Sequence, residues 1–151
     1  MEVLCGKYFV KCKAMKGYLY FKDRSKLFIN PRGKHYDTFD IFLLEDGKVK
    51  IKYSYYSGYY LKSKDNVLEM SKGNGDDFFY IILNDNGTYS FKNENGYYLT
   101  VNNDRNLYLD QYMENSNYQQ FLLERVGHGF HIDVLDGNAF VRCIEGIENY
   151  I

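Results

Sequence analysis

The chain has 151 residues, a net charge of −1, and a composition that is 45% hydrophobic and 26% charged, which predicts one soluble globular domain with its own core. No stretch approaches the roughly 18 consecutive apolar residues of a membrane span, and residues 1–17 lack an apolar leader segment. We therefore expect neither a transmembrane segment nor a leader. The three cysteines form no CxxC pair, which excludes that zinc signature and predicts a reducing compartment, the cytoplasm.

Aromatic residues are unusually frequent and indicate strands. The chain has 17 Tyr and 11 Phe but no Trp, and Tyr and Phe favour the pleated, half-buried surface of a sheet. In residues 48–52 every second residue is lysine, with Val49 and Ile51 between them. A period of two turns Val49 and Ile51 toward the core and the lysines toward water. No window shows a sustained helical period, so the predicted fold is all-β.

Three repeats of about forty residues organise the chain. Strand-like runs end at Gly47, Gly87 and Gly127, which are spaced 40 residues apart. We therefore predict repeats at 7–47, 48–87 and 88–127, each with four short strands. In chain order these are a first strand (8–10, 49–51, 89–91), a strand at a Gly-Tyr phrase (17–20, 58–61, 96–99), a third strand (27–29, 68–70, 107–109) and a fourth that ends at the turn glycine (39–47, 78–87, 119–127).

Twelve strands in three equal units predict a closed barrel with a cap, because closure removes the exposed strand edges that otherwise aggregate. Apolar residues that recur at equivalent repeat positions are predicted to be buried. They are Leu27, Ile29, Ile51, Leu61, Leu68, Ile81, Leu83, Phe91, Leu99, Leu107, Leu109, Phe121 and Leu123.

The last residues, 128–151, fall outside the three repeats and read as a further β-hairpin. This hairpin is either added to a complete domain of residues 1–127 or replaces the N-terminal hairpin in closing the barrel. The first repeat has all four of its strand segments, which favours an added hairpin packed on the domain.

Signals for catalysis are weak, and we predict a protein that is not an enzyme and has no cofactor or metal. The three histidines, His35, His128 and His131, lie in no recognisable nucleophile motif, and surface loop positions explain them more simply than a metal site. A glycosylation sequon begins at Asn86. Because Asn-Gly is also a favoured hairpin turn, its use for glycosylation stays open.

Charge is distributed unevenly along the chain. Residues 1–64 carry 14 Lys and Arg against 6 Asp and Glu, whereas residues 65–151 carry 5 against 14. The strongest candidate for a binding surface combines lysines with tyrosines, whose rings offer flat, amphipathic contact area. This predicted Lys/Tyr patch consists of Lys48, Lys50, Lys52, Tyr55, Tyr56, Tyr60, Lys62 and Lys64. A solvated hairpin face is the simpler alternative.

The repeated pattern KVxIKxxxxGxYLxxxDxxVxxxx…FxIxLxxxG, clearest in residues 48–87, resembles β-trefoil proteins of the fascin and hisactophilin group. This resemblance covers residues 6–127 and implies a β-trefoil that binds a protein partner inside the cell, such as an actin filament. The chain departs from hisactophilin in having only three histidines, and from ricin-type lectins in lacking tryptophan and their Gln-x-Trp motif.

Two other functions remain open beside protein binding. Tyrosine platforms are also suited to stacking on sugars, which would make the domain a carbohydrate-binding, lectin-like trefoil. Lysines beside aromatic rings are equally suited to phosphates and bases, which would make it a partner of nucleic acid or ribonucleoprotein. Strong salt dependence would favour nucleic acid over a glycan. The oligomeric state does not follow from these patterns.

Overall fold

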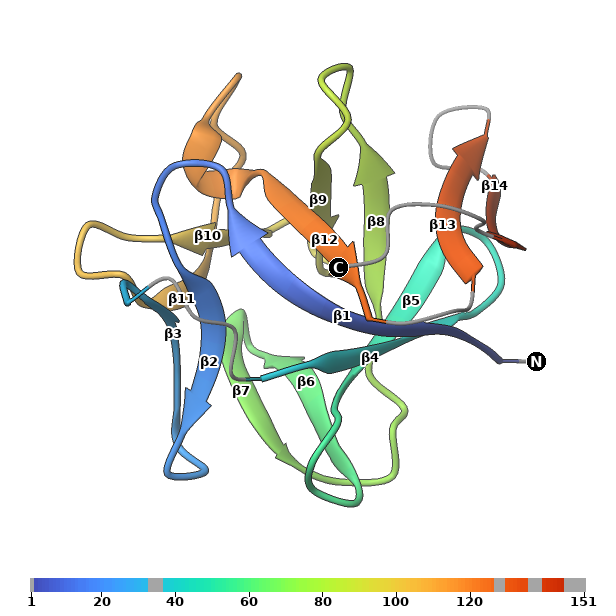
Figure 1. Ribbon diagram of the computed structural model, residues 1–151, viewed down its shortest axis with the longest axis horizontal. Helices are drawn as coiled ribbons and strands as arrows, with labels where there is room; N and C mark the ends of the chain where they lie inside the picture. The colour runs from blue at the N-terminus through green and yellow to red at the C-terminus, as the bar shows by residue number, and fades with distance from the viewer. Residues whose placement is uncertain (1, 33–36, 127–129, 136–139, 146–151) are drawn as a thin grey trace.

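The computed structural model of the chain describes residues 2–32, 37–126, 130–135 and 140–145. The regular secondary structure of these residues consists of strands and one 3₁₀ turn (Figure 1). The strands up to the middle of the chain are β1 (Val3–Cys12), β2 (Tyr18–Lys22), β3 (Lys26–Asn30), β4 (Phe39–Leu43), β5 (Lys48–Tyr53), β6 (Tyr59–Lys64) and β7 (Val67–Lys72). The later strands are β8 (Phe79–Leu83), β9 (Tyr89–Lys92), β10 (Tyr98–Val101), β11 (Leu107–Asp110), β12 (Phe121–Arg125), β13 (Phe130–Leu135) and β14 (Phe140–Glu145). One 3₁₀ turn, η1 (Asn117–Gln119), precedes β12.

Six of these strands close into a barrel. Each of the pairs β1–β4, β4–β5, β5–β8, β8–β9, β9–β12 and β12–β1 is antiparallel, and the last pairing returns to the first strand. Closure pairs the backbone of both terminal barrel strands, so neither is left as an edge. The prediction of an all-β fold with a closed barrel is confirmed.

The other strands between residues 18 and 110 form the hairpins β2–β3, β6–β7 and β10–β11. Each predicted forty-residue segment thus contributes two barrel strands, its first and its last, with one hairpin between them. Within the described residues, no helix is long and apolar enough to span a membrane.

Strands β13 and β14 pair with each other near the C-terminus. Figure 1 shows this hairpin to one side of the barrel, where β13 lies next to β1 and β8 and β14 lies next to β4. His35 and His128, which were predicted to lie in surface loops, are outside the described residues, as is Gly127. Cys12 is a buried free thiol, whereas Cys5 is disulfide-bonded, and the cytoplasmic location stays a prediction.

The core fills the barrel and the space beneath the hairpins. Its side chains come from alternate strand positions, such as Val49, Ile51 and Tyr53 on β5, as a period of two requires. Ten residues of the predicted core are buried, namely Leu27, Ile29, Ile51, Leu61, Ile81, Phe91, Leu99, Leu107, Leu109 and Phe121. Leu68 and Leu123 are half-buried and pack against these.

Leu83 was wrongly predicted to be in the core, since 40% of its surface is exposed. It follows the buried Phe79 and Ile81 at the same two-residue spacing along β8. Alternation predicts the face of a strand to which a side chain belongs but not its depth. Leu83 is the last residue of β8, beside the turn, and faces a surface pocket described below.

A buried carboxyl group joins the first hairpin to the barrel. Asp37, just before β4, accepts a hydrogen bond from the backbone N of Phe21 on β2 (2.7 Å) and another from the hydroxyl of Tyr53 on β5 (3.0 Å). The Tyr53 ring also packs against Phe21 and Phe39, with centroids 5.1 and 5.7 Å apart. Burial raises the pKa of Asp37 above its ordinary value, although both hydrogen bonds oppose the shift.

The core assignment predicts very different effects for two leucines. Leu99→Ala should lower the free energy of unfolding by about 2–5 kcal/mol, because it removes a buried side chain and leaves a cavity. Leu83→Ala should cost less than about 1 kcal/mol, because the side chain is largely outside the core. Urea denaturation of the two variants measures both values, and equal losses would contradict this assignment.

The raised pKa of Asp37 predicts a pH-dependent contribution to stability. Because the folded chain holds this proton more tightly than the unfolded chain, the stabilisation is fully present below the unfolded pKa of about 3.9 and is lost as pH rises through the folded pKa. The free energy of unfolding of the native protein, minus that of Asp37→Asn, should therefore fall as pH rises above the unfolded pKa of about 3.9. Thermal and urea denaturation at several pH values test this, and parallel curves would refute it.

Candidate functional site

Lys50, at the centre of the predicted Lys/Tyr patch, is buried rather than solvated. Only 7% of its surface is exposed, and its ammonium group forms an ion pair with Glu2. The same Nζ lies 5.7 Å from the centre of the Phe42 ring and 5.2 Å from that of Tyr60. Lys50 is therefore neutralised and packed within the protein.

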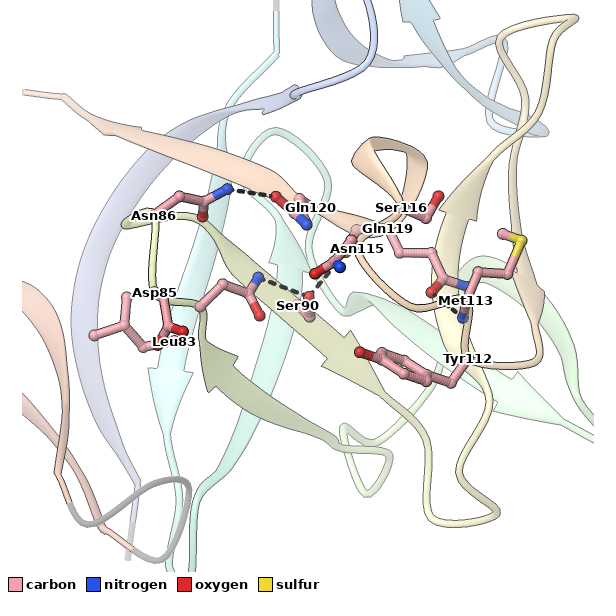
Figure 2. A pocket seen from close by; sticks show the side chains of 11 residues that line it. Leu83, Asp85, Asn86, Ser90, Tyr112, Met113, Asn115, Ser116, Gln119 and Gln120 are labelled. Carbon is pink, nitrogen blue, oxygen red and sulfur yellow. Dashed lines mark hydrogen bonds between the residues drawn. The ribbon is translucent and has the colours of Figure 1, made fainter.

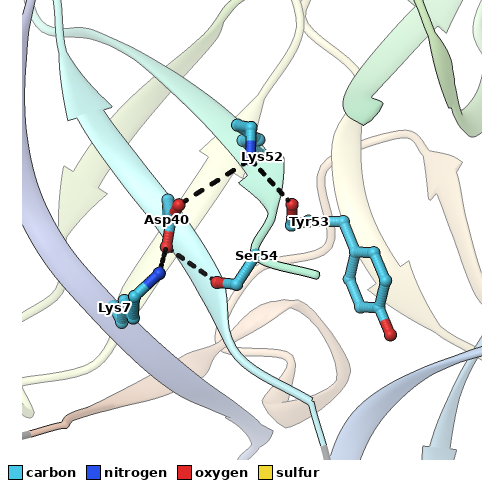
Figure 3. Close-up of polar contacts among 5 residues, drawn as sticks. All are labelled: Lys7, Asp40, Lys52, Tyr53 and Ser54. Atoms are coloured by element: carbon cyan, nitrogen blue, oxygen red, sulfur yellow. Dashed lines mark hydrogen bonds and ion pairs between the residues drawn. The ribbon is translucent and has the colours of Figure 1, made fainter. Parts of the chain in front are cut away.

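Lys52 is held by a carboxylate from the neighbouring strand (Figure 3). Its Nζ lies 4.0 Å from Asp40 Oδ2 and donates a hydrogen bond to the carbonyl of Tyr53 (3.2 Å). Asp40 Oδ1 also accepts hydrogen bonds from Lys7 Nζ (3.0 Å) and Ser54 Oγ (2.7 Å). This network joins β1, β4 and β5 and holds the Lys52 side chain, which is 19% exposed, against the barrel.

The remaining lysines of the patch have different surroundings. Lys48 Nζ lies 4.5 Å from the centre of the Phe78 ring, a cation–π distance. Lys62 Nζ donates to the carbonyl of Lys72 (2.8 Å) across the β6–β7 hairpin. Lys64 is exposed at the end of β6. The five lysines thus do not share one environment.

The tyrosines of the patch serve mainly in packing. Tyr56 is half-buried against Tyr53, with ring centres 5.1 Å apart, beneath the guanidinium of Arg24 at 4.5 Å. Tyr60 is half-buried beneath Lys50. Tyr55 is the most open of the three, with 58% of its surface exposed.

A different region offers a concave site. An open pocket of about 410 Å³ lies between the β8–β9 turn and the loop 111–120. Figure 2 shows Leu83, Asp85 and Asn86 on one wall, Tyr112, Met113 and Asn115 on the other, and Ser90 between them. The lining is completed by Asn84, Ser116, Gln119 and Gln120.

The first wall is shaped by the sequence Asn84-Asp85-Asn86-Gly87. Gly87 has φ +84°, which suits a glycine, and the turn closes with Gly87 N donating to the Asn84 carbonyl (3.0 Å). Asn86 Oδ1 accepts from the N and Oγ1 of Thr88 (3.1 and 2.7 Å), while Asn86 Nδ2 donates to Gln120 Oε1 (2.7 Å). The side chain that begins the sequon therefore binds the turn and ties it to the opposite loop.

The second wall is anchored by a buried glutamine. Gln119 Oε1 accepts from Met113 N (2.9 Å), and Gln119 Nε2 donates to the Gln111 carbonyl (2.7 Å) and to Thr100 Oγ1 (3.1 Å). The Gln119 carbonyl accepts from Ser90 Oγ (2.9 Å). These bonds fix the loop across the pocket before any ligand arrives.

Several groups in the pocket are left available. The Tyr112 side chain is 61% exposed and meets Tyr98 with ring centres 5.1 Å apart, which supports the ring from one side. Asp85 and Asn115 are exposed, and neither side chain has a hydrogen-bond partner among the described residues. Asn84 uses both amide hydrogens on Thr88 and Ser90, which leaves its Oδ1 as an acceptor. The lining contains no lysine, arginine or histidine.

One small residue, Ser90, lies between the two walls of the pocket. Ser90 faces Ile82 across β8–β9 as Lys50 faces Phe42 across β4–β5. At β4–β5 the lysine extends toward the loop before β8, where a Cβ at Gly75 would lie 3.1 Å from Lys50 Nζ. Gly75 and Asn115, at corresponding places in the two loops, both have positive φ (+78° and +56°). Lys50 thus reaches the loop before β8, whereas the shorter Ser90 lines the pocket.

Sequence reasoning missed this pocket. Its turn was predicted from Asn86-Gly87, but turn asparagines have a structural explanation. The usable signal lay in residues 111–120, where Gln, Asn and Ser cluster around Tyr112 without strand alternation. Within the described residues no three His, Cys, Asp or Glu side chains gather to hold a metal ion.

Comparison with solved structures identifies similar folds. A β-1,3-galactosidase of family GH43 matches with a TM-score of 0.65 and 18% identity over 80% of this chain. The Polyporus squamosus lectin, bound to the epitope Neu5Acα2-6Galβ1-4GlcNAc, matches with a TM-score of 0.63 and 14% identity, also over 80% of this chain. The chain spans 27% of the first structure and 49% of the second. No family model and no curated protein sequence matches.

The surroundings of Lys50 predict a cost for reversing its charge. Lys50→Glu should lower the free energy of unfolding by roughly 2–4 kcal/mol, because it buries a carboxylate beside Glu2 without a cation. Lys64→Glu should change it by less than about 0.5 kcal/mol, because that side chain is exposed. Urea denaturation separates the two, and an unchanged Lys50→Glu variant would show that the lysine is solvated after all.

Proposed function

We propose that this domain is a β-trefoil of three repeats that binds a carbohydrate in the pocket between the β8–β9 turn and loop 111–120. The three four-strand segments, each with two barrel strands and a hairpin, support the trefoil assignment. The likeness to the lectin supports the same fold.

The observation that carries the proposal is the chemistry around Tyr112. Sugars present apolar ring faces beside hydroxyl groups, so their sites combine an exposed aromatic ring with carboxylate and carboxamide groups. Here Tyr112 supplies the ring, Asp85 an acceptor, and Asn115 a donor and an acceptor. The walls are fixed by their own hydrogen bonds, so little ordering accompanies binding.

The same pocket supports binding rather than hydrolysis. Most glycoside hydrolases place two carboxyl groups about the scissile bond, one as the acid and one as the base or nucleophile. The pocket lining includes a single carboxylate, that of Asp85. We therefore keep the proposal of a non-catalytic module.

The comparisons and the lysine contacts favour a glycan over the other partners considered. Nucleic-acid binding was predicted from the Lys/Tyr patch, and actin binding was implied by the fascin and hisactophilin resemblance. Within the patch, Lys50 pairs with Glu2 and Lys52 lies beside Asp40. The resemblance to fascin and hisactophilin is compatible with a trefoil. Neither protein is among the similar structures described above.

Two exposed tyrosines offer a matched test of the site. Tyr112→Ala should weaken binding to an immobilised glycan panel by about tenfold or more, because it removes the stacking surface. Tyr55→Ala removes a similarly exposed ring from the Lys/Tyr patch and should leave glycan binding unchanged.

Both variants should retain the thermal stability of the native protein to within a few degrees. A loss of glycan binding can then be assigned to the missing ring rather than to unfolding. Loss of binding in Tyr55→Ala alone would move the site to the Lys/Tyr patch. Absence of binding to any glycan by the native protein would overturn the proposed function.

A further inference from the structure

The carbohydrate pocket contains more exposed apolar surface than hydroxyl recognition requires. Leu83 is 40% exposed and Met113 is 39% exposed, on opposite walls, in addition to Tyr112 (Figure 2). Because both side chains line the pocket, they offer apolar surface that an apolar group of a ligand can cover. A sugar with hydroxyl groups alone would leave Leu83 uncovered or place a hydroxyl against it.

The polar groups next to Leu83 are acceptors. Asp85 carries an exposed carboxylate, and Asn84 Oδ1 accepts no hydrogen bond within the described part of the chain. A substituent that meets this wall should therefore present an N–H or O–H donor together with a methyl group. An acetamido group has both, since its N–H donates and its methyl is apolar.

The charge of the pocket sets a second condition. With one carboxylate and no cation in its lining, the pocket repels an anionic group brought within a few ångströms of Asp85. Acidic sugars are thus disfavoured, in contrast to the sialylated epitope bound by the structurally similar lectin.

We infer that the pocket selects an uncharged N-acetylated hexose, with the sugar ring on Tyr112 and the acetamido group against Leu83 and Asp85. This inference rests on the proposed carbohydrate function and specifies its ligand class. It also gives a role to Leu83, which is exposed at the end of β8 beside the turn.

Saturation-transfer difference NMR and competition against the glycan panel test the inference with matched sugars. The methyl glycosides of N-acetylglucosamine and N-acetylgalactosamine should bind about fivefold more tightly than those of glucose and galactose, since a buried methyl and one hydrogen bond contribute at this level. N-acetylneuraminic acid carries an acetamido group with a carboxylate, and should bind more weakly than either N-acetylated hexose.

Leu83→Ser should reduce the preference for the N-acetylated sugar to less than about twofold, because the apolar contact with the acetamido methyl is lost. Leu122→Ser is the control, because Leu122 is equally exposed, at 40%, but lies on β12 outside the pocket lining. This control should retain the full preference.

The outcomes separate the two claims. Equal binding of acetylated and parent sugars, or tighter binding of N-acetylneuraminic acid, would overturn the ligand class while leaving a carbohydrate site in place. A preference that survives Leu83→Ser would also overturn it, since the acetamido group would then bind elsewhere. If no glycan of the panel binds, the proposed function fails and this inference fails with it.

Discussion

The sharing of strand β9 between β8 and β12 is the constraint on which the pocket depends. Tyr89, the first residue of β9, pairs with Leu83 of β8 on one side and with Phe121 of β12 on the other. This brings the β8–β9 turn and the end of loop 111–120 side by side, although more than 30 residues separate Asn86 from Gln120 along the chain. The hydrogen bonds of Ser90 to Gln119 and of Asn86 to Gln120 follow from this pairing. Barrel closure by β1 and β12 in turn holds β12 in place.

Carboxamide side chains have a double use in this protein. Asn84, Asn86 and Gln119 satisfy turn and loop groups that lie outside the sheet ladders, which keeps both walls rigid. Asn115 makes no such bond among the described residues and stays available to a ligand. The same residue type thus builds the scaffold and supplies the recognition groups, which is why asparagine-rich segments alone did not reveal the site.

The strand order, the barrel and most of the core could be predicted because they depend on local alternation and on a forty-residue period. Lys50 shows where this reasoning ends. Its alternation with Val49 and Ile51 predicts a solvated side chain, but Glu2 and the rings of Phe42 and Tyr60 come from elsewhere in the sequence and enclose it. For Leu83 the error is the opposite one. Alternation predicted the correct face of β8, but the side chain is exposed rather than buried. The pocket needed the contact between two distant segments, and no local pattern encodes that contact.

The most direct test of the carbohydrate site is a ¹H–¹⁵N NMR titration of the native protein with methyl N-acetylglucosaminide and methyl N-acetylgalactosaminide. Our account predicts that the side-chain amide signals of Asn84, Asn115 and Gln120 shift, with backbone signals moving in 83–90 and 111–120 while 48–64 stay unchanged. Shifts confined to residues 48–64, or no shift with either glycoside or with any glycan of the panel, would contradict it.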